Sequence, residues 1–96
     1  RRAEGLGVAI GLEAINRWLK DAVQNHPPPP YRNRPVKLYY ISQVAVSPPT
    51  FALFTNEPRG IDESYQRYLT RHLRENYSFT GAPLRLLFRQ REKERP

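Results

Sequence analysis

Two histidines and four serines are the residues of this chain most suited to proton transfer or nucleophilic attack. None of the serines stands in a G-x-S-x-G turn, and no base or oxyanion site is organised beside one. His26 and His72 lie far apart without spaced carboxylate or cysteine partners, so a ligated metal is not expected. The chain also lacks a G-x-x-x-x-G-K-[ST] phosphate loop. The sequence therefore predicts no catalytic residue, no metal and no cofactor in this chain.

Positive charge is the chemical feature that stands out instead. Sixteen Lys and Arg against nine Asp and Glu give a net charge of +7, which attracts polyanions such as nucleic acid. No acidic residue occurs between Asp21 and Glu57, whereas Arg32, Arg34 and Lys37 fall in that interval. A local positive patch is therefore predicted there.

Length and composition limit the kind of molecule that can carry this patch. Ninety-six residues, with 39% apolar and 11% aromatic side chains, are enough for one compact core and too few for two. The absence of cysteine fits a reducing compartment, and no apolar run approaches the roughly 20 residues of a membrane span. We expect a cytoplasmic protein without membrane contact, and the isolated chain to be a monomer.

The first element that could position these residues is a helix over 12–25. Apolar residues recur there on one stripe, and the prolines of 27–30 must end the helix. Trp18 lies on the stripe and is read as a core anchor, with ligand stacking as the alternative. The proline run is read as a stiff spacer, with a polyproline ligand as the alternative.

Aromatic and β-branched runs at 36–46 and 51–55 predict a hairpin around the pair Pro48 and Pro49. Asp62 is a plausible N-cap for a second helix that ends near Asn76. A third strand is predicted over 84–89. The expected fold is a two-layer α+β domain of order α-β-β-α-β, with a three-stranded sheet and two helices on one face.

The domain is expected to cover 12–89. Residues 1–11 have loosely spaced glycines and are read as a linker or terminal edge. Residues 90–96 have no periodicity and are expected to form a flexible tail.

The sheet face away from the helices is predicted to be too apolar for simple contact with water. A mixture of aliphatic, aromatic and basic side chains there favours docking of a protein partner. Stacking of RNA bases on the rings is the rival interpretation. The docking candidates are Lys37, Tyr39, Ile41, Phe54, Arg85, Leu87 and Arg89.

The second predicted helix has an apolar stripe and an opposed basic stripe. A solvated helix face is the plain interpretation of such a basic stripe, and contact with RNA phosphates is the functional one. The RNA-contact candidates are Arg32, Arg34, Arg67, Arg71 and Arg74.

Many short motifs in a fixed order carry a resemblance to a known family. They are IN and WL in the first helix, then HPPP, KLYY, PPTF, SYQRYL, LRENYSF and GAPLRLLFR, and together they span about 10–89. On these residues the chain resembles the C-terminal KH-like domain of the bacterial Der (EngA) GTPases, proteins with two tandem GTPase domains.

The resemblance implies a non-catalytic module that docks on the GTPase domains of the same polypeptide and contacts ribosomal RNA while the large ribosomal subunit matures. GTP and Mg²⁺ would belong to those GTPase domains. The chain lacks the GxxG loop with which KH domains grip RNA, so RNA contact would use another surface. Leu12 follows Gly11 where family members usually place a Ser or Thr, so the residues do not define an N-terminal cap for the first helix. The alternatives are a free-standing RNA-binding protein and, with less support, an enzyme.

Overall fold

The computed structural model describes residues 9–79 and 81–91. The predicted order of helices and strands is confirmed, with one short 3₁₀ helix added. The elements are α1 (Leu12–Asn25), β1 (Leu38–Val46), β2 (Pro49–Thr55), η1 (Pro58–Gly60), α2 (Glu63–Asn76) and β3 (Arg85–Gln90).

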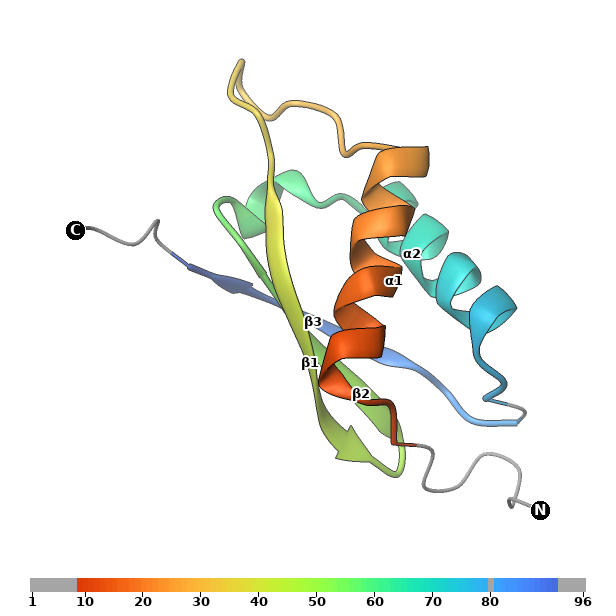
Figure 1. Ribbon diagram of the computed structural model, residues 1–96. Helices are drawn as coiled ribbons and strands as arrows, with labels where there is room; N and C mark the ends of the chain where they lie inside the picture. Colours follow the sequence, from red (N-terminus) through yellow and green to blue (C-terminus); the bar gives the residue numbers. More distant parts are fainter. Residues whose placement is uncertain (1–8, 80, 92–96) are drawn as a thin grey trace.

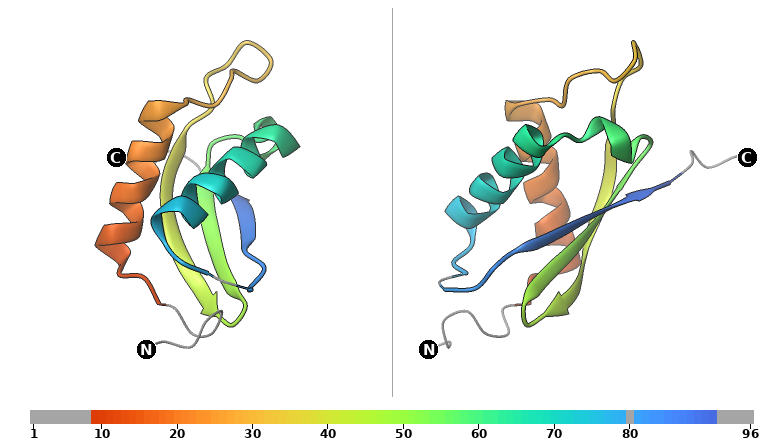
Figure 2. Two further views of the ribbon diagram at one scale, coloured as in Figure 1. Left: turned by 90° about the vertical axis from the view of Figure 1, so that its right-hand side faces the viewer. Right: turned by 180° about the vertical axis from the view of Figure 1, so that it is seen from behind.

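The three strands form one sheet of order β1-β2-β3, and both helices lie on the same side of it (Figures 1 and 2). β1 and β2 pair antiparallel as the predicted hairpin. β3 pairs parallel to β2, because α2 carries the chain back to the starting end of β2. The domain is thus a two-layer α+β fold with a mixed sheet whose central strand is β2.

Local signals explain both ends of α1 and the start of α2. α1 begins after Gly11 without a side-chain cap, and the proline run stops it after Asn25. α2 begins after Asp62, whose side chain accepts a hydrogen bond from the Tyr65 N–H at 2.9 Å. Asp62 therefore satisfies one of the free amides at the start of α2, which confirms the predicted cap.

Three hydrogen bonds made by side chains join α1, and the residue that follows it, to α2. The Trp18 Nε1–H donates to His72 Nδ1 at 2.8 Å, and the indole is only 5% exposed, which confirms Trp18 as a core anchor. The Tyr65 and Tyr68 hydroxyls donate to the carbonyl oxygens of His26 and Ala22 at 2.7 and 2.6 Å. Burial raises the pKa of the Tyr65 hydroxyl, so it remains a neutral donor. The C-terminal end of α1 is therefore fixed against α2.

The hydrophobic core lies between the helices and the sheet. Phe51 and Leu53 of β2 are fully buried, and Phe79, beyond α2, meets Phe51 edge to face with ring centroids 6.2 Å apart. Ile15 and Leu69 bring the two helices into the same cluster. β2 is the strand whose burial holds the layers together.

Two register irregularities in β1 overturn part of the predicted sheet faces. They lie between Leu38 and Tyr40 and between Gln43 and Ala45, and each gives β1 one residue more than β2. A bulge of this kind shifts the alternation of side chains by one position. Ile41 consequently lies opposite Leu53 and is fully buried in the core, so its assignment to the face away from the helices was wrong.

β3 ends at Gln90, one residue past the predicted third strand. The Gln90 side chain donates to the Asn56 carbonyl oxygen at 2.8 Å, and the Arg91 N–H donates to the Thr55 carbonyl oxygen at 2.8 Å. The rest of the predicted tail, and most of the predicted linker, lie outside the described residues.

Candidate functional site

The sheet face turned away from α1 and α2 is built from rows of side chains that cross all three strands. One row joins Tyr40, Phe54 and Arg89, and the next joins Ser42, Ala52 and Leu87. This face, called the reverse face below, consists of Tyr40, Ser42, Ala45, Thr50, Ala52, Phe54, Arg85, Leu87 and Arg89.

The reverse face has an apolar centre and a basic margin. The rings of Tyr40 and Phe54 lie against each other with centroids 5.9 Å apart, and both side chains are half-buried, as is Leu87. Arg85 and Arg89 are exposed on the outer strand. Neither described helix covers this face (Figure 2). An apolar centre with arginines beside it has the composition of a protein interface, whereas a base-stacking platform would require more exposed rings.

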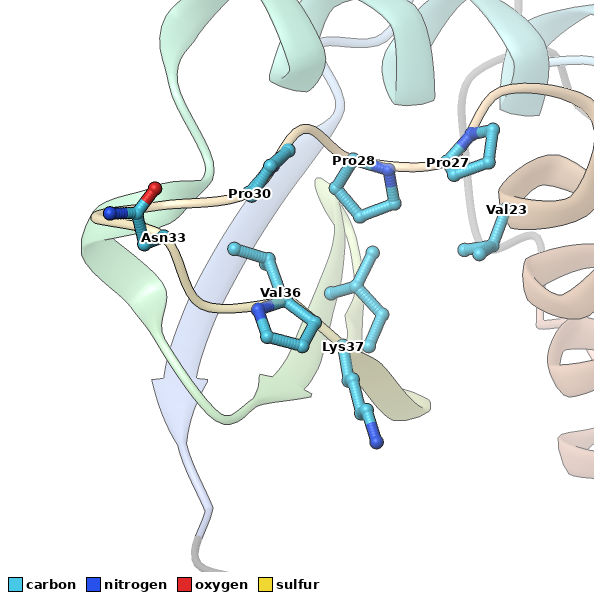
Figure 3. A pocket seen from close by; sticks show the side chains of 9 residues that line it. Val23, Pro27, Pro28, Pro30, Asn33, Val36 and Lys37 are labelled. Atoms are coloured by element: carbon cyan, nitrogen blue, oxygen red, sulfur yellow. The ribbon is translucent and has the colours of Figure 1, made fainter.

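Four of the seven predicted docking residues meet on the reverse face, and three do not. Lys37 precedes β1 and lines a hollow beside the proline run (Figure 3). Tyr39 is 38% exposed and lies at the edge of β1 next to α1, and Ile41 is in the core. The expectation that these three side chains share the face of Phe54 was therefore wrong. Tyr40 of β1 lies on the reverse face instead. Nothing in the amino-acid sequence indicates the bulge that turns Tyr40 toward this face.

A tight turn carries the first two RNA-contact candidates. Tyr31 and Arg34 exchange two backbone hydrogen bonds of 2.9 and 3.0 Å, and the two residues between them have φ angles of 51° for Arg32 and 66° for Asn33. These values define a two-residue hairpin turn of type I′. Because arginine seldom adopts a positive φ, the turn holds Arg32 in a sparsely populated conformation.

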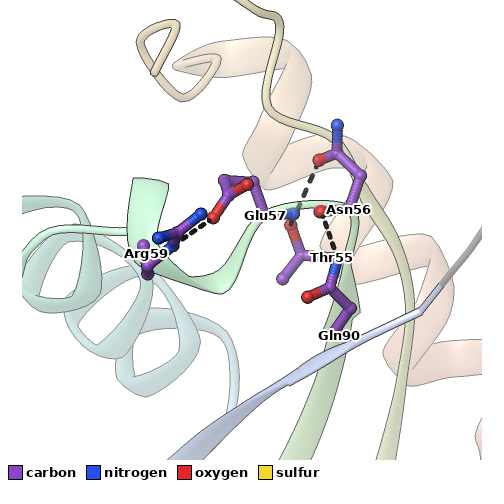
Figure 4. A network of polar contacts seen from close by, with 5 residues as sticks. All are labelled: Thr55, Asn56, Glu57, Arg59 and Gln90. Carbon is purple, nitrogen blue, oxygen red and sulfur yellow. Dashed lines mark hydrogen bonds and ion pairs between the residues drawn. The ribbon is translucent and has the colours of Figure 1, made fainter. Parts of the chain in front are cut away.

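A third arginine joins this turn from η1. The guanidinium carbons of Arg32 and Arg59 lie 5.2 and 5.7 Å from the centroid of the Tyr31 ring. Arg59 also donates to a Glu57 carboxylate oxygen at 2.8 Å (Figure 4), and this hydrogen bond lowers the pKa of Glu57, with a smaller contribution from the charge of Arg34. We call Tyr31, Arg32, Arg34 and Arg59 the arginine tip. Sequence reasoning missed Arg59 because its place beside Tyr31 depends on tertiary packing.

Gly60 allows η1 to approach the tip this closely. A Cβ at this position would lie 2.8 Å from Val36 Cγ2 and 2.9 Å from Tyr31 Cβ. Both distances are shorter than packed carbon atoms allow, so only glycine fits without a shift of the tip or of η1.

The predicted basic stripe of α2 divides into two kinds of residue. Arg67 and Arg71 are exposed, and Arg67 has only a 3.8 Å ion pair with Glu63 one turn away. Arg74 instead donates to the carbonyl oxygens of Phe79 and Ala82 at 3.5 and 3.0 Å. Arg74 thus holds the connection to β3 although it is exposed, whereas Arg67 and Arg71 make no such backbone contact among the interactions described.

Two other kinds of site are absent from the described part of the chain. Within 9–79 and 81–91, no group of three or more His, Cys, Asp or Glu side chains could hold a metal ion. Neither of the described helices has the length and apolar character needed to cross a bilayer.

Comparison with known proteins agrees with this geometry. Residues 10–89 match the family model described as the KH-domain-like C-terminal domain of EngA bacterial GTPase enzymes. The chain is 45% identical over 87 residues to GTPase Der of Thermomicrobium roseum, with 91% of this chain and 19% of that protein covered. It is 46% identical over 92 residues to GTPase Der of Trichlorobacter lovleyi, with 96% and 20% covered.

A third relative, GTPase Der of Moorella thermoacetica, is 49% identical over 81 residues, which cover 84% of this chain and 18% of that protein. The chain therefore spans about a fifth of the length of the curated relatives it matches. The match runs from before α1 to the penultimate residue of β3, so it includes both helices and all three strands. The chain belongs to the family of KH-domain-like domains found C-terminally in EngA bacterial GTPases.

Proposed function

We propose that this chain is a non-catalytic module of a ribosome-assembly GTPase. Its reverse face docks on the GTPase domains of the same polypeptide, and its arginine tip contacts ribosomal RNA during assembly of the large subunit. GTP and Mg²⁺ are bound by the GTPase domains. The observation that carries the proposal is the row of Tyr40, Phe54 and Arg89, which neither described helix covers, on a domain whose family is joined to GTPases.

Docking through the reverse face follows from its chemistry. Tyrosine and arginine are the side chains that most often dominate binding energy at protein interfaces, because each combines a large contact area with a polar group. Here they flank a half-buried phenylalanine at the ends of one row. A partner that covers this row would remove the remaining exposed ring surface from water.

The double variant Tyr40→Ala, Arg89→Ala is expected to bind the GTPase domains at least about tenfold more weakly, since loss of two such side chains costs more than about 1 kcal/mol each. The measurement is calorimetric titration of the chain into the GTPase Der of Moorella thermoacetica from which the matching C-terminal region has been removed. Leu12→Ala is the control, because Leu12 is a 53% exposed apolar residue on α1, on the other side of the sheet. Equal affinities for the double variant and the unchanged chain would refute docking through this face.

RNA contact through the arginine tip is supported by the restricted conformation of its side chains. Arginine is suited to phosphate because its planar guanidinium donates in a fixed geometry. The turn and the Tyr31 ring restrict Arg32, and Arg34 stands directly beside it in the same hairpin. Side chains that are already restricted lose less entropy when they bind.

The variant Arg32→Gln, Arg34→Gln is expected to flatten the dependence of RNA affinity on salt, by about 0.7 to 0.9 in log K against log salt for each phosphate that the variant no longer neutralises. The measurement is binding of large-subunit ribosomal RNA over a series of salt concentrations. Arg67→Gln, Arg71→Gln is the matched control, with the same change in charge on exposed residues of α2. If the α2 variant flattens the slope and the tip variant does not, the tip is not the phosphate-contact surface.

A further inference from the structure

An apolar hollow with a volume of about 680 Å³ lies between the end of α1, the proline run and the start of β1 (Figure 3). Proline rings form one wall, and Val36 and Leu38 approach from the side of the strand. The apolar lining residues are Val23, Pro27, Pro28, Pro30, Pro35, Val36 and Leu38.

A second hollow of about 350 Å³ continues the first along the edge of β1. The two share Val23 and Leu38, and the second adds Lys20 of α1 and Tyr39 of β1. Together they form one groove between α1 and the first half of β1, called the α1–β1 groove below. β1 is an outer strand of the sheet, so no described strand lies on this side of the groove.

The charges of the groove have one sign. Lys20 and Lys37 are the charged residues among those that line it, and no described lining residue is acidic. Arg32 and Arg34 stand on the same connection that supplies the proline wall. The electrostatic potential of the groove is therefore positive, which favours a ligand that carries carboxylates.

The walls favour side chains of a protein over nucleotides. Proline has no N–H, so this wall offers few donors for phosphates or base edges, while its rings present rigid apolar surface. Because the backbone angle φ of proline is fixed, this wall loses little conformational entropy when a ligand binds. Strand addition at the middle of β1 is blocked, because the Asn16 side-chain amide already bonds to the Ile41 N–H and C=O at 3.0 and 2.8 Å. Recognition in the groove must therefore come mainly from side chains.

We propose that the α1–β1 groove binds an extended acidic peptide segment of a partner protein. Large apolar side chains of the segment occupy the two hollows on either side of Val23 and Leu38, and its carboxylates pair with Lys20 and Lys37. This surface is distinct from the reverse face, and it adjoins the arginine tip at Asn33, which also lines the first hollow. Its charged contacts are Lys20 and Lys37 rather than the arginines of the tip, so the proposal holds or fails independently of the proposed function.

The test begins with a phage-displayed library of random dodecapeptides selected on the 96-residue chain. The expected consensus contains Asp or Glu near one or two large apolar residues. A synthetic peptide of that consensus, titrated into the labelled chain, should shift the methyl NMR signals of Val23, Val36 and Leu38. The signals of Leu87 on the reverse face should stay in place.

Variants then test the groove directly. Lys20→Glu, Lys37→Glu should weaken the synthetic peptide by about tenfold or more, a loss of about 1.4 kcal/mol. Arg67→Glu, Arg71→Glu makes the same change in net charge on α2 and should leave the affinity within about twofold, because both residues are exposed and α2 supplies no residue that lines the groove. Val23→Phe should fill the junction of the two hollows and so lower the affinity for the peptide. Circular dichroism checks that each variant folds.

Several results would overturn the proposal. They are a library without enrichment, a consensus without acidic residues, peptide shifts confined to the reverse face, and equal losses in the two charge-reversed variants. Ribosomal RNA that shifts the groove methyl signals when no peptide does would assign the groove to RNA instead. Shifts of the same signals with protein concentration alone would assign it to a second copy of the chain.

Discussion

Phe51→Ala is expected to lower the free energy of unfolding by about 3 to 5 kcal/mol, because it empties the centre of the core. Phe51 is fully buried on the central strand, and its ring meets Phe79 edge to face. Removing it takes apolar packing from both layers and leaves a cavity that the sheet cannot close. Urea denaturation followed by far-ultraviolet circular dichroism gives the difference.

Phe54→Ala is the matched control for this experiment. Phe54 is the same residue type on the same strand, three positions along, but it lies on the reverse face and is half-buried. Its truncation is expected to cost about 1 kcal/mol, in the range of partly exposed substitutions. If both variants lost the same free energy, the assignment of helix face and reverse face on β2 would be incorrect.

Asn16→Ala is expected to destabilise the domain by about 2 to 4 kcal/mol, because each unpaired, partly buried backbone group costs about 1 to 3 kcal/mol. The Asn16 side-chain oxygen accepts from the Ile41 N–H at 3.0 Å, and the side-chain NH₂ donates to the Ile41 C=O at 2.8 Å. Alanine at this position leaves both groups of β1 without their partner. Thermal unfolding and hydrogen exchange at the Ile41 amide should both report the loss.

Asn76→Ala provides the comparison for Asn16→Ala. The Asn76 side-chain amide donates to the His72 carbonyl oxygen of its own helix, near the exposed end of α2. Its removal is expected to cost less than about 1 kcal/mol and to leave exchange at Ile41 unchanged. A loss as large as that of Asn16→Ala would mean that the bridge to β1 contributes little.

The helices were predictable because their signals are local. The apolar stripe of α1 and the prolines after it define 12–25, and the Asp62 carboxylate lies where a cap of α2 is needed. Such signals act within one or two turns of chain, so the order of residues is sufficient to find them.

The faces of the sheet were only partly predictable for the opposite reason. β2 and β3 alternate regularly, so Phe54, Arg85, Leu87 and Arg89 were placed together correctly. β1 contains two bulges, and a bulge depends on how one strand fits the strand beside it. The assignment of Tyr39 and Ile41 therefore failed where pairing, rather than composition, determines direction.

The candidate RNA surface shows the same division. Arg32 and Arg34 are candidates on charge alone, since the segment around them has no acidic residue, and their contact with RNA stays a prediction. The place of Arg59 beside Tyr31 could not be predicted, because only tertiary packing brings η1 there. The bonds of Arg74 to backbone carbonyls past the end of its helix likewise depend on packing. The sequence shows where basic residues are abundant, whereas only the tertiary structure shows which of their side chains contact other parts of the chain.

The bridge from Asn16 to Ile41 also has a consequence for the behaviour of the chain at high concentration. An outer strand rich in aromatic and β-branched residues is the segment of a protein most prone to cross-β aggregation. Because Asn16 occupies the outward hydrogen-bonding groups in the middle of β1, a neighbouring molecule cannot extend the sheet there. The side chain that joins α1 to β1 is thus expected to disfavour fibril growth from this edge of the sheet.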